Sequence, residues 1–313
     1  MVTEQLQNRR PTDLPQAERV KAMIAVGITV VLWASAFVAI RDVGHVLSPG
    51  PLALVRIGVA AAALTVVGLA RVARTRAAVP VSRRSLLLIA LYGVLWLAGY
   101  TVVLNAGEQH VDAGTAALLV NIAPLLVAFG AGVFLGEGYP RALIVGSLVA
   151  FGGVGIIALD SGGQRDWTGV LLCVAAALLY AAGVLIQKAA LRGVDGFTAT
   201  WFACVAGFVV LLPWLPETVG ELASAPPGAI LGAVYLGLFP TAIGFSTWAY
   251  ALRRTEAGRL TATTYAVPAV SVLLSSVLLG EVPSVLGLLG GAVCLAGVAI
   301  SRGRARAARA TAA

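Results

Sequence analysis

Long stretches without Asp, Glu, Lys or Arg dominate the pattern of hydrophobic and polar positions. Eight of them cover residues 22–40, 85–107, 113–136, 142–159, 167–187, 196–216, 260–280 and 282–301. Another, 222–252, begins in a Pro226-Pro227 loop, so its helix is expected to start near Gly228. A last stretch, 51–70, is interrupted only by Arg56. About 20 apolar residues are enough for a helix to cross a bilayer. The pattern therefore predicts an all-α, polytopic membrane protein with ten transmembrane helices.

Composition agrees with this pattern. Hydrophobic residues make up 59% of the 313 residues, and charged residues only 12%. A soluble domain carries about 25% charged residues, because its surface must face water. A lipid environment removes that need, so the low charge content favours a chain that lies mostly in the membrane.

The basic residues predict an orientation. The net charge is +8, and all of the 22 Lys and Arg residues except Arg41, Arg56 and Arg165 fall in loops or ends that ten spans place on the cytoplasmic side. Short cytoplasmic loops are enriched in Lys and Arg. We therefore expect a multi-pass protein of the cytoplasmic membrane with both termini cytoplasmic. Contact with anionic lipid headgroups is a secondary interpretation of these residues, and no nucleic-acid module is visible.

Metal and cofactor chemistry finds no support in the sequence. The three cysteines, Cys173, Cys204 and Cys294, fall inside predicted spans without metal-ligand spacing. Buried cysteines of this kind usually act as small packing residues. The two histidines, His45 and His110, lie in predicted loops. We predict neither a metal site nor a cofactor.

The second half of the chain repeats the first. A shift of 144 residues places Pro124 on Pro268 and Gly93 on Gly237. The same shift places Leu135-Gly136-Glu137 on Leu279-Gly280-Glu281, Gly146 on Gly290 and Gly153 on Gly297. Nearer the start of each half the shift is 147, which places Trp33 on Tyr180 and Arg41 on Lys188. Each half holds five spans, an odd number, so the halves should enter the membrane from opposite sides. Inverted repeats of this kind are typical of secondary transporters, although an old duplication without transport would leave the same pattern.

Several of these segments resemble the EamA-type proteins of the drug/metabolite transporter superfamily. The resemblance rests on Leu32-Trp33-Ala34-Ser35-Ala36-Phe37-Val38-Ala39-Ile40-Arg41, on Arg56, on Asn121 to Pro124 and on the duplicated Leu-Gly-Glu triplet. It implies ten helices in two inverted five-helix repeats, at residues 22–160 and 167–301. A polar cytoplasmic segment, 1–21, and a basic cytoplasmic tail, 302–313, flank them. It also implies a central cavity lined largely by the first, third, fourth, sixth, eighth and ninth helices.

Polar and aromatic residues inside the spans are the candidates for substrate binding. Such groups are costly in hydrocarbon and usually face the interior of the bundle. Helix–helix hydrogen bonding or anchoring at the membrane interface remains an alternative for each. Anchoring is the favoured alternative for Tyr100 because it lies near a span end. The predicted substrate-binding residues are Trp33, Ser35, Tyr100, Asn121, Tyr180, Thr241 and Tyr265.

A second group of residues is predicted to act in gating or as hinges: Arg56, Pro124, Pro268, Glu137 and Glu281. Prolines in mid-span kink a helix, although they also aid static packing. Arg56 either reaches the outer interface or caps helix carbonyls, or it receives a substrate carboxylate or gates the outer mouth. Glu137 and Glu281 end matching helices at opposite faces. No Asp or Glu lies in mid-membrane, which weighs against a buried carboxylate as proton carrier and leaves coupling through Glu137, Glu281 or another site open.

These expectations favour a secondary transporter that moves a small metabolite by alternating access, as exporter or exchanger. An amino acid, a derivative of one or a small amphiphilic compound would suit the candidate residues. The alternatives are a non-transporting membrane subunit and a membrane enzyme acting on lipid-linked substrates. An enzyme would need clustered His, Asp, Glu or Cys near one interface, which this sequence lacks, so we predict that the protein is not an enzyme. Its partners are predicted to be a small-molecule substrate and membrane lipids.

Overall fold

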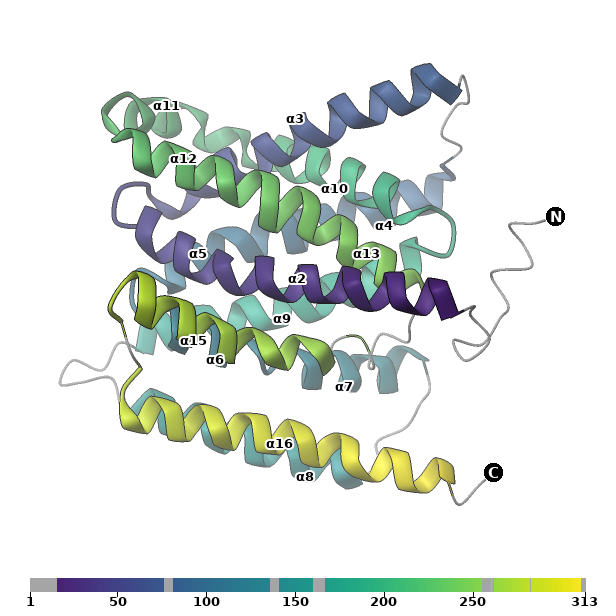
Figure 1. The fold of residues 1–313 in the computed structure, drawn as a ribbon, viewed down its shortest axis with the longest axis vertical. Coiled ribbons are helices and arrows are strands. Elements are labelled where there is room, and N and C mark those ends of the chain that lie inside the picture. The colour runs from purple at the N-terminus through teal and green to yellow at the C-terminus, as the bar shows by residue number, and fades with distance from the viewer. Residues whose placement is uncertain are drawn as a thin grey trace.

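The structure is a computed structural model that describes residues 16–75, 81–135, 141–159, 167–254, 260, 262–281 and 283–310. Within these ranges all regular secondary structure is helical (Figure 1). The α-helices of the first half are α2 (Gln16–Val43), α3 (Pro49–Thr75), α4 (Arg83–Tyr92), α5 (Thr101–Gly107), α6 (Ala113–Val120), α7 (Ala123–Leu135) and α8 (Arg141–Leu159). Those of the second half are α9 (Trp167–Ala190), α10 (Gly196–Leu211), α11 (Leu215–Ser224), α12 (Pro227–Leu236), α13 (Gly244–Arg254), α15 (Ala266–Leu278) and α16 (Val285–Ala310). Two π-helical segments, η2 (Gly93–Tyr100) and η4 (Gly237–Ile243), and two 3-10 turns, η3 (Leu212–Trp214) and η5 (Ala262–Tyr265), join some of them.

Several of these helices have the length and hydropathy of membrane spans. Among the described residues, six continuous helical stretches are long and apolar enough: Gln16–Val43, Pro49–Thr75, Arg83–Gly107, Trp167–Ala190, Gly196–Ser224 and Pro227–Arg254. Four shorter apolar helical stretches are Ala113–Val127, Ile144–Gly153, Ala266–Leu278 and Val285–Gly297. Together they fall in the ten hydrophobic stretches of the sequence, and many of their large side chains, such as Leu87 and Val277, are exposed. The protein is therefore a multi-pass membrane protein.

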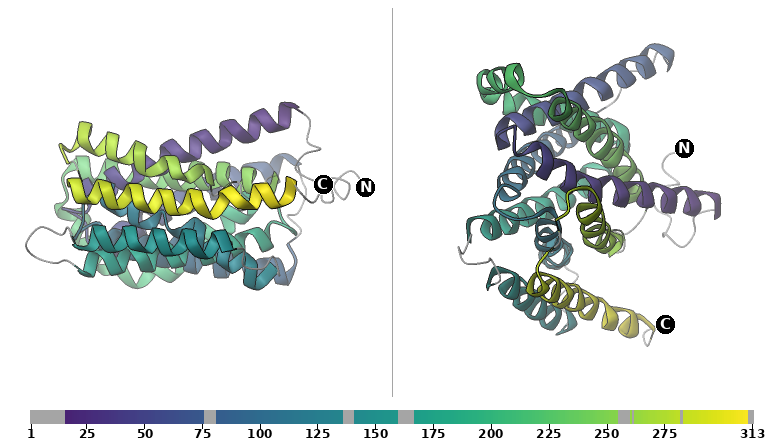
Figure 2. Two further views of the ribbon diagram at one scale, coloured as in Figure 1. Left: turned by 90° about the horizontal axis from the view of Figure 1, so that it is seen from below. Right: turned by 60° about the vertical axis from the view of Figure 1, so that its left-hand side comes forward.

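The bundle is built around α2. This helix packs against α12, α13 and α15 of the second half and against α6 of the first. On one side α10 packs against α3, α4 and η2, and on the other α9 packs against α4, α5, α6 and α7. The helices α8 and α16 form a pair that runs along one side of the bundle, as Figures 1 and 2 show. The two halves are thus interleaved in the core and not separate.

Glycines allow α8 and α16 to approach closely. A Cβ atom at Gly153 would lie 2.5 Å from the carbonyl oxygen of Gly290, and one at Gly297 would lie 2.5 Å from the carbonyl oxygen of Gly146. Small residues permit this kind of backbone contact between membrane helices. Under the 144-residue shift, Gly146 matches Gly290 and Gly153 matches Gly297. The contact between Gly153 and Gly290 is therefore the repeat equivalent of the contact between Gly297 and Gly146.

The π-helical segments show the same exchange. Gly93 begins η2 and Gly237 begins η4, and the two glycines are related by the 144-residue shift. A Cβ at Gly93 would lie 2.4 Å from the carbonyl oxygen of Ala203, and one at Gly237 would lie 2.7 Å from that of Arg56. Arg56 and Ala203 are themselves related by the 147-residue shift. In each half, therefore, a glycine lies against the backbone of the other half, and the two contacted positions, Ala203 and Arg56, match each other in the repeat.

The duplicated prolines do not lie in the middle of continuous helices. The helix α6 ends at Val120, and Pro124 is the second residue of α7. Pro268 lies in the first turn of α15, which directly follows η5. Proline suits the first turn because the N–H that it lacks has no intrahelical partner there. The expected mid-helix kinks are thus helix breaks, each followed by a new helix that carries the proline near its start.

All three cysteines are buried and free. The thiol of Cys294, in α16, donates to the carbonyl oxygen of Ala150, in α8, over 3.1 Å. Both His45 and His110 are exposed in turns between helices. These placements match the sequence-based interpretation of packing cysteines and loop histidines.

Candidate functional site

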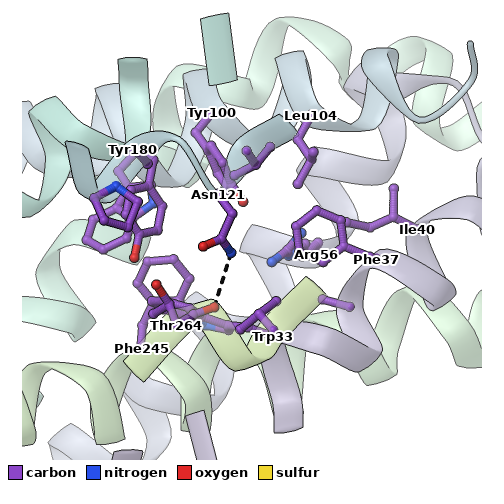
Figure 3. Close-up of a pocket in the computed structure, with 16 residues that line it drawn as sticks. Trp33, Phe37, Ile40, Arg56, Tyr100, Leu104, Asn121, Tyr180, Phe245 and Thr264 are labelled. Atoms are coloured by element: carbon purple, nitrogen blue, oxygen red, sulfur yellow. Dashed lines mark hydrogen bonds between the residues drawn. The ribbon is translucent and has the colours of Figure 1, made fainter. Parts of the chain in front are cut away.

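A pocket lies where helices of both halves meet (Figure 3). It contains about 530 Å³ of space that protein atoms do not fill, part of which is open to the outside. The first half contributes residues from α2, α3, η2, α5, α6 and α7, and the second half contributes residues from α9, α13, η5 and α15. The lining residues are Trp33, Ala36, Phe37, Ile40, Arg56, Trp96, Tyr100, Leu104, Val120, Asn121, Ala123, Pro124, Tyr180, Phe245, Thr264 and Val267.

Aromatic rings form one wall of the pocket. The ring centroid of Trp96 lies 4.9 Å from those of both Tyr180 and Phe245. Trp33 lies 6.1 Å from Trp96 and 6.0 Å from Tyr180, with edge-to-face geometry in both pairs. Tyr100 extends the cluster, 6.1 Å from Tyr180. Because aromatic pairs prefer such edge-to-face contacts, the rings support one another and leave a stiff apolar surface toward the pocket.

Arg56 is the charged residue of the lining. Its side chain is 3% exposed, and its Nε donates to the hydroxyl oxygen of Thr241 over 2.8 Å. Its Nη1 is buried and has no hydrogen-bond partner among the described residues. A buried guanidinium with an unused donor is costly. The pocket therefore presents a positive group that an anion entering it would satisfy.

The π-helical segment η4 explains how Thr241 comes to hold Arg56. Pro240 lies inside η4 and has no N–H to donate to the preceding turn. The hydroxyl of Thr241 donates instead to the carbonyl oxygen of Leu236 over 2.8 Å. Its oxygen then remains available to accept from Arg56. The local irregularity of the helix is thus what orients the arginine.

Asn121 joins the two halves across the pocket. It follows the last residue of α6, and its side-chain Nδ2 donates to the backbone oxygen of Thr264 over 3.1 Å, the bond drawn in Figure 3. Its Oδ1 is buried without a hydrogen-bond partner among the described residues. The bond therefore links the break before α7 to the break before α15, and it leaves an acceptor at the pocket.

One end of the pocket is covered by charged residues, and we call it the Arg41 end, where α2 ends and α3 begins. Arg41 Nε donates to Glu281 Oε1 over 3.0 Å, and Arg41 Nη1 donates to the backbone oxygen of Glu108 over 2.7 Å. Ile40 and Leu104, which directly precede this layer in α2 and α5, line the pocket. Arg41 thus connects the ends of α2, α5 and α15 next to the pocket residues Ile40 and Leu104.

The opposite end of the bundle, the Glu18 end, is where α2 starts and α13 finishes. Glu18 Oε2 accepts from the Tyr250 hydroxyl over 3.0 Å and from Arg254 Nε over 3.2 Å. Glu18 Oε1 accepts from Lys21 Nζ over 3.1 Å. The guanidinium of Arg254 also lies over the Tyr250 ring, 3.5 Å from its centroid. These contacts join the two halves at the Glu18 end as Arg41 does at the other.

The structure brings six of the twelve residues predicted from the sequence together around the pocket. The pocket lining includes Trp33, Arg56, Tyr100, Asn121, Pro124 and Tyr180. Ser35 and Thr241 are not part of it: the Ser35 hydroxyl contacts the Tyr235 hydroxyl at 2.7 Å, and Thr241 contacts Arg56. Pro268 is buried in α15 and Glu281 pairs with Arg41. Glu137 and the side chain of Tyr265 lie outside what the structure describes.

The structure argues against two of the alternatives that the sequence left open. Arg56 does not extend to a membrane interface, because its side chain is buried and bonded to Thr241. Tyr100 is buried against the pocket and does not anchor the chain at an interface. Both lie on faces of η2 and α3 that turn inward, a rotation that the uniformly apolar sequence around them does not reveal.

Sequence reasoning missed several lining residues. Trp96, Phe37 and Phe245 are apolar aromatics in apolar spans, so nothing in the pattern separates them from lipid-facing residues. Sequence reasoning also did not single out Glu108, which does not line the pocket but is buried, with 1% exposed. Its position directly after the predicted 85–107 span was the available signal.

Comparison with known proteins assigns the chain to a family. The model of the EamA-like transporter family matches residues 20–159 and 167–303. The chain is 43% identical over 279 residues to a probable terminal-alkyne amino-acid exporter of Streptantibioticus cattleyicolor, covering 89% of this chain and 92% of that protein. It is 32% identical over 280 residues to the uncharacterized transporter YdfC of Bacillus subtilis, covering 89% and 90%.

A solved crystal structure has a similar fold, with a TM-score of 0.63, 21% sequence identity and coverage of 91% of this chain and 97% of the other. The family and the relatives are named as transporters. From these matches, and from the multi-pass apolar fold, we conclude that this chain is a membrane transporter and not an enzyme, and that it belongs to the EamA-like transporter family.

Proposed function

We propose that the protein is a secondary transporter that moves small carboxylate-bearing metabolites, such as amino acids or their derivatives, across the cytoplasmic membrane. The observation that carries this proposal is the unpaired Nη1 of the buried Arg56 in an otherwise largely apolar pocket. A carboxylate is the natural partner of a guanidinium. The aromatic wall of Trp33, Trp96 and Tyr180 suits a compact apolar side chain on the same solute.

Transport by alternating access follows from the arrangement of two inverted five-helix repeats that we infer for the chain. The exchanged contacts of Gly93 with Ala203 and of Gly237 with Arg56 support such a relation between the halves. The glycine pairs of α8 and α16 support it independently. Two equivalent halves pack in two related ways of similar energy, one open to each side. The bias of basic residues supports an external Arg41 end and two cytoplasmic termini.

The two ends of the pocket are then the two gates. In this proposal Arg41 and Glu281 close the external mouth, and Glu18, Tyr250 and Arg254 close the cytoplasmic one. Pro124 and Pro268 serve as hinges, since each begins a helix after a break beside the pocket. Asn121, Tyr100 and Tyr180 contact the solute together with Arg56. Thr241 then supports the site by holding Arg56, and Ser35 supports it through its contact with Tyr235. The substrate-binding role of Tyr265 and the gating role of Glu137 stay predictions from the sequence.

The substrate class draws on the relative from Streptantibioticus cattleyicolor, which is named a probable exporter of terminal-alkyne amino acids. An alkyne side chain is small, rigid and apolar, which suits the aromatic wall. An amino acid also carries the carboxylate that Arg56 needs. We therefore propose amino acids with short apolar side chains as the first solutes to test, with export or exchange as the direction of transport.

Counterflow in liposomes tests the proposal. Purified protein is reconstituted with an excess of unlabelled L-propargylglycine inside, and uptake of the labelled compound is followed; a parallel experiment uses the amide of the same amino acid. The proposal predicts uptake of the acid, little uptake of the amide, and loss of uptake in Arg56→Gln. Arg253→Gln, at an exposed position, is the matched control. Absence of flux for a broad panel of amino acids and derivatives would favour a non-transporting membrane subunit.

A further inference from the structure

The carboxyl group of Glu108 is buried, and no described residue forms a hydrogen bond with it. The residue follows Gly107, the last residue of α5, and is 1% exposed. Its backbone is fully engaged: the N–H donates to the carbonyl oxygen of Leu104 over 2.9 Å, and the carbonyl oxygen accepts from Arg41. In contrast, neither Oε1 nor Oε2 has a hydrogen-bond partner among the described residues. An ionised carboxylate in this position would lack both water and donors, which is strongly unfavourable.

Charged and titratable groups face Glu108 from each neighbouring element, and none of them neutralises it by contact. Arg41 of α2 donates to Glu281 and to the Glu108 backbone, and Arg56 of α3 donates through its Nε to Thr241. Neither guanidinium donates to the Glu108 carboxyl. The groups that interact electrostatically with the Glu108 carboxyl, without a hydrogen bond to it, are Arg41, Arg56, Tyr100 of η2, Asp112 before α6, Cys173 of α9 and Glu281 after α15. Two of these, Asp112 and Glu281, carry the same negative charge.

Burial therefore raises the pKa of the Glu108 carboxyl well above its usual range, and Asp112 and Glu281 add to this effect while Arg56 and Arg41 oppose it. Glu108 lies directly after the Arg83–Gly107 span, at the charged layer that covers the pocket. In the conformation described here, burial favours the neutral, protonated carboxyl of Glu108 over the ionised carboxylate. The same carboxyl would ionise if the layer separated and water entered.

We propose that Glu108 is a proton-binding site that couples the Arg41 end of the pocket to pH. Its carboxyl holds a proton while Arg41 and Glu281 are in contact. Opening of this end releases Arg41 from Glu281, lets water reach Glu108 and frees Arg41 to pair with the ionised carboxylate, while the proton passes to water. By linkage, the closed conformation binds one more proton than the open one, so falling pH favours closure.

The inference rests on the proposed transport function for its biological meaning, but its test uses no solute. Spin labels are placed at His45→Cys and Val285→Cys, both exposed and next to the Arg41 end, in protein whose three buried cysteines are replaced by alanine. Double electron–electron resonance then measures the label distance in liposomes from about pH 8 to about pH 5. We expect two populations of label distances, a short one from the closed conformation and a long one from the open conformation. The ratio of short to long should rise about tenfold as the pH falls from about 8 to about 5.

Two variants make the result decisive. Glu108→Gln, which mimics the protonated acid, should show the short distance at every pH and lose the titration. Glu281→Gln, which breaks the ion pair but leaves Glu108, should show more of the long distance while keeping the pH dependence. A parent protein without pH dependence, or a Glu108→Gln variant that titrates like the parent, overturns the proposal.

Infrared difference spectra between the same pH limits give a direct readout of the proton. The carbonyl band of a protonated carboxylic acid should appear on acidification of the parent and be absent in Glu108→Gln. Persistence of that band in the variant would assign the proton to another group and refute the proposal. If the band and the distance titration are present while counterflow of every amino acid fails, the proton site stands and the proposed transport function fails.

Discussion

Arg41 Nε lies 3.0 Å from Glu281 Oε1, across 240 positions of sequence, and this contact joins the end of α2 to the segment after α15. Both side chains are partly exposed, 20% and 26%. The same guanidinium donates to the backbone oxygen of Glu108. One arginine therefore links both halves of the chain beside the pocket.

Breaking this ion pair should open the Arg41 end more often. A partly exposed pair contributes up to about 1 kcal/mol, which corresponds to about a fivefold change in a two-state ratio. We expect Glu281→Gln to raise the open fraction by up to that factor, as measured by the distance between labels at positions 45 and 285. The double variant Arg41→Glu with Glu281→Arg should recover part of the closed fraction. An unchanged distribution in the single variant would show that the contact does not hold this end closed.

Arg56 should discriminate between solutes by their carboxylate. A hydrogen bond to a charged partner contributes about 1.5–3 kcal/mol, so Arg56→Gln should weaken binding of an amino acid about tenfold to a hundredfold. Arg56→Lys keeps the charge but loses the planar guanidinium, and it should restore only part of the affinity. Isothermal titration with acids and their amides measures the effect. An equal loss for acid and amide would mean that Arg56 acts only through the structure.

Thr241 should matter because it orients Arg56. Thr241→Val removes the oxygen that accepts from Arg56 and the donor to Leu236, and it should raise KM for amino-acid transport and lower stability by about 1–3 kcal/mol. Thr241→Ser should restore both properties. Thr65 accepts from Trp201 Nε1 over 2.8 Å and does not line the pocket, so Thr65→Val is the matched control. That control should lower stability without changing KM; a KM change of equal size in both would refute the orienting role.

The repeat makes a prediction about two glycines at once. Gly93→Ala and Gly237→Ala would each place a methyl group against backbone oxygen, 2.4 Å from Ala203 and 2.7 Å from Arg56. Overpacking of this kind costs about 1–3 kcal/mol, so both variants should unfold at lower temperature in detergent. Gly152, which has no atom within 4 Å of an added Cβ, provides the control variant Gly152→Ala. A large effect at only one of the two matched glycines would contradict the equivalence of the halves.

The sequence predicted the helical class well, because that class depends on features that are visible along one dimension. The inverted repeat stays a prediction, which the matched glycine contacts support. Hydropathy marks where each apolar helix runs, and matched residues such as Gly93 and Gly237 mark equivalent positions. The rotation of each helix about its axis is not visible in this way, since lipid-facing and interior faces are both apolar. For that reason Trp96 and Phe245 were missed, and Ser35 was expected in a pocket that it does not line.

The sequence also did not predict where the helical backbone becomes irregular. Pro240 was not expected to lie in a π-helical segment, and its missing N–H is what gives Thr241 its role beside Arg56. Pro124 was expected to kink one helix, whereas the structure breaks that helix at Asn121 and starts another. Beside Pro240 the adjacent Thr241 hydroxyl donates to Leu236, and beside Pro124 the Asn121 side chain donates to Thr264 in the other half. Hydropathy reveals neither contact.

Access to Ala36 from both sides of the membrane tests the central claim most directly. Ala36 lines the pocket and is 5% exposed, whereas Ala34 is fully buried and does not line it. Ala36→Cys, in protein without its native cysteines, is treated with a membrane-impermeant thiol reagent in right-side-out and in inside-out vesicles, with Ala34→Cys as control. The account predicts that Ala36→Cys reacts from either side and that a transported amino acid slows both reactions, while Ala34→Cys stays unreactive. Reaction from one side only, whatever the solute or pH, would contradict a pocket that opens alternately to the two sides.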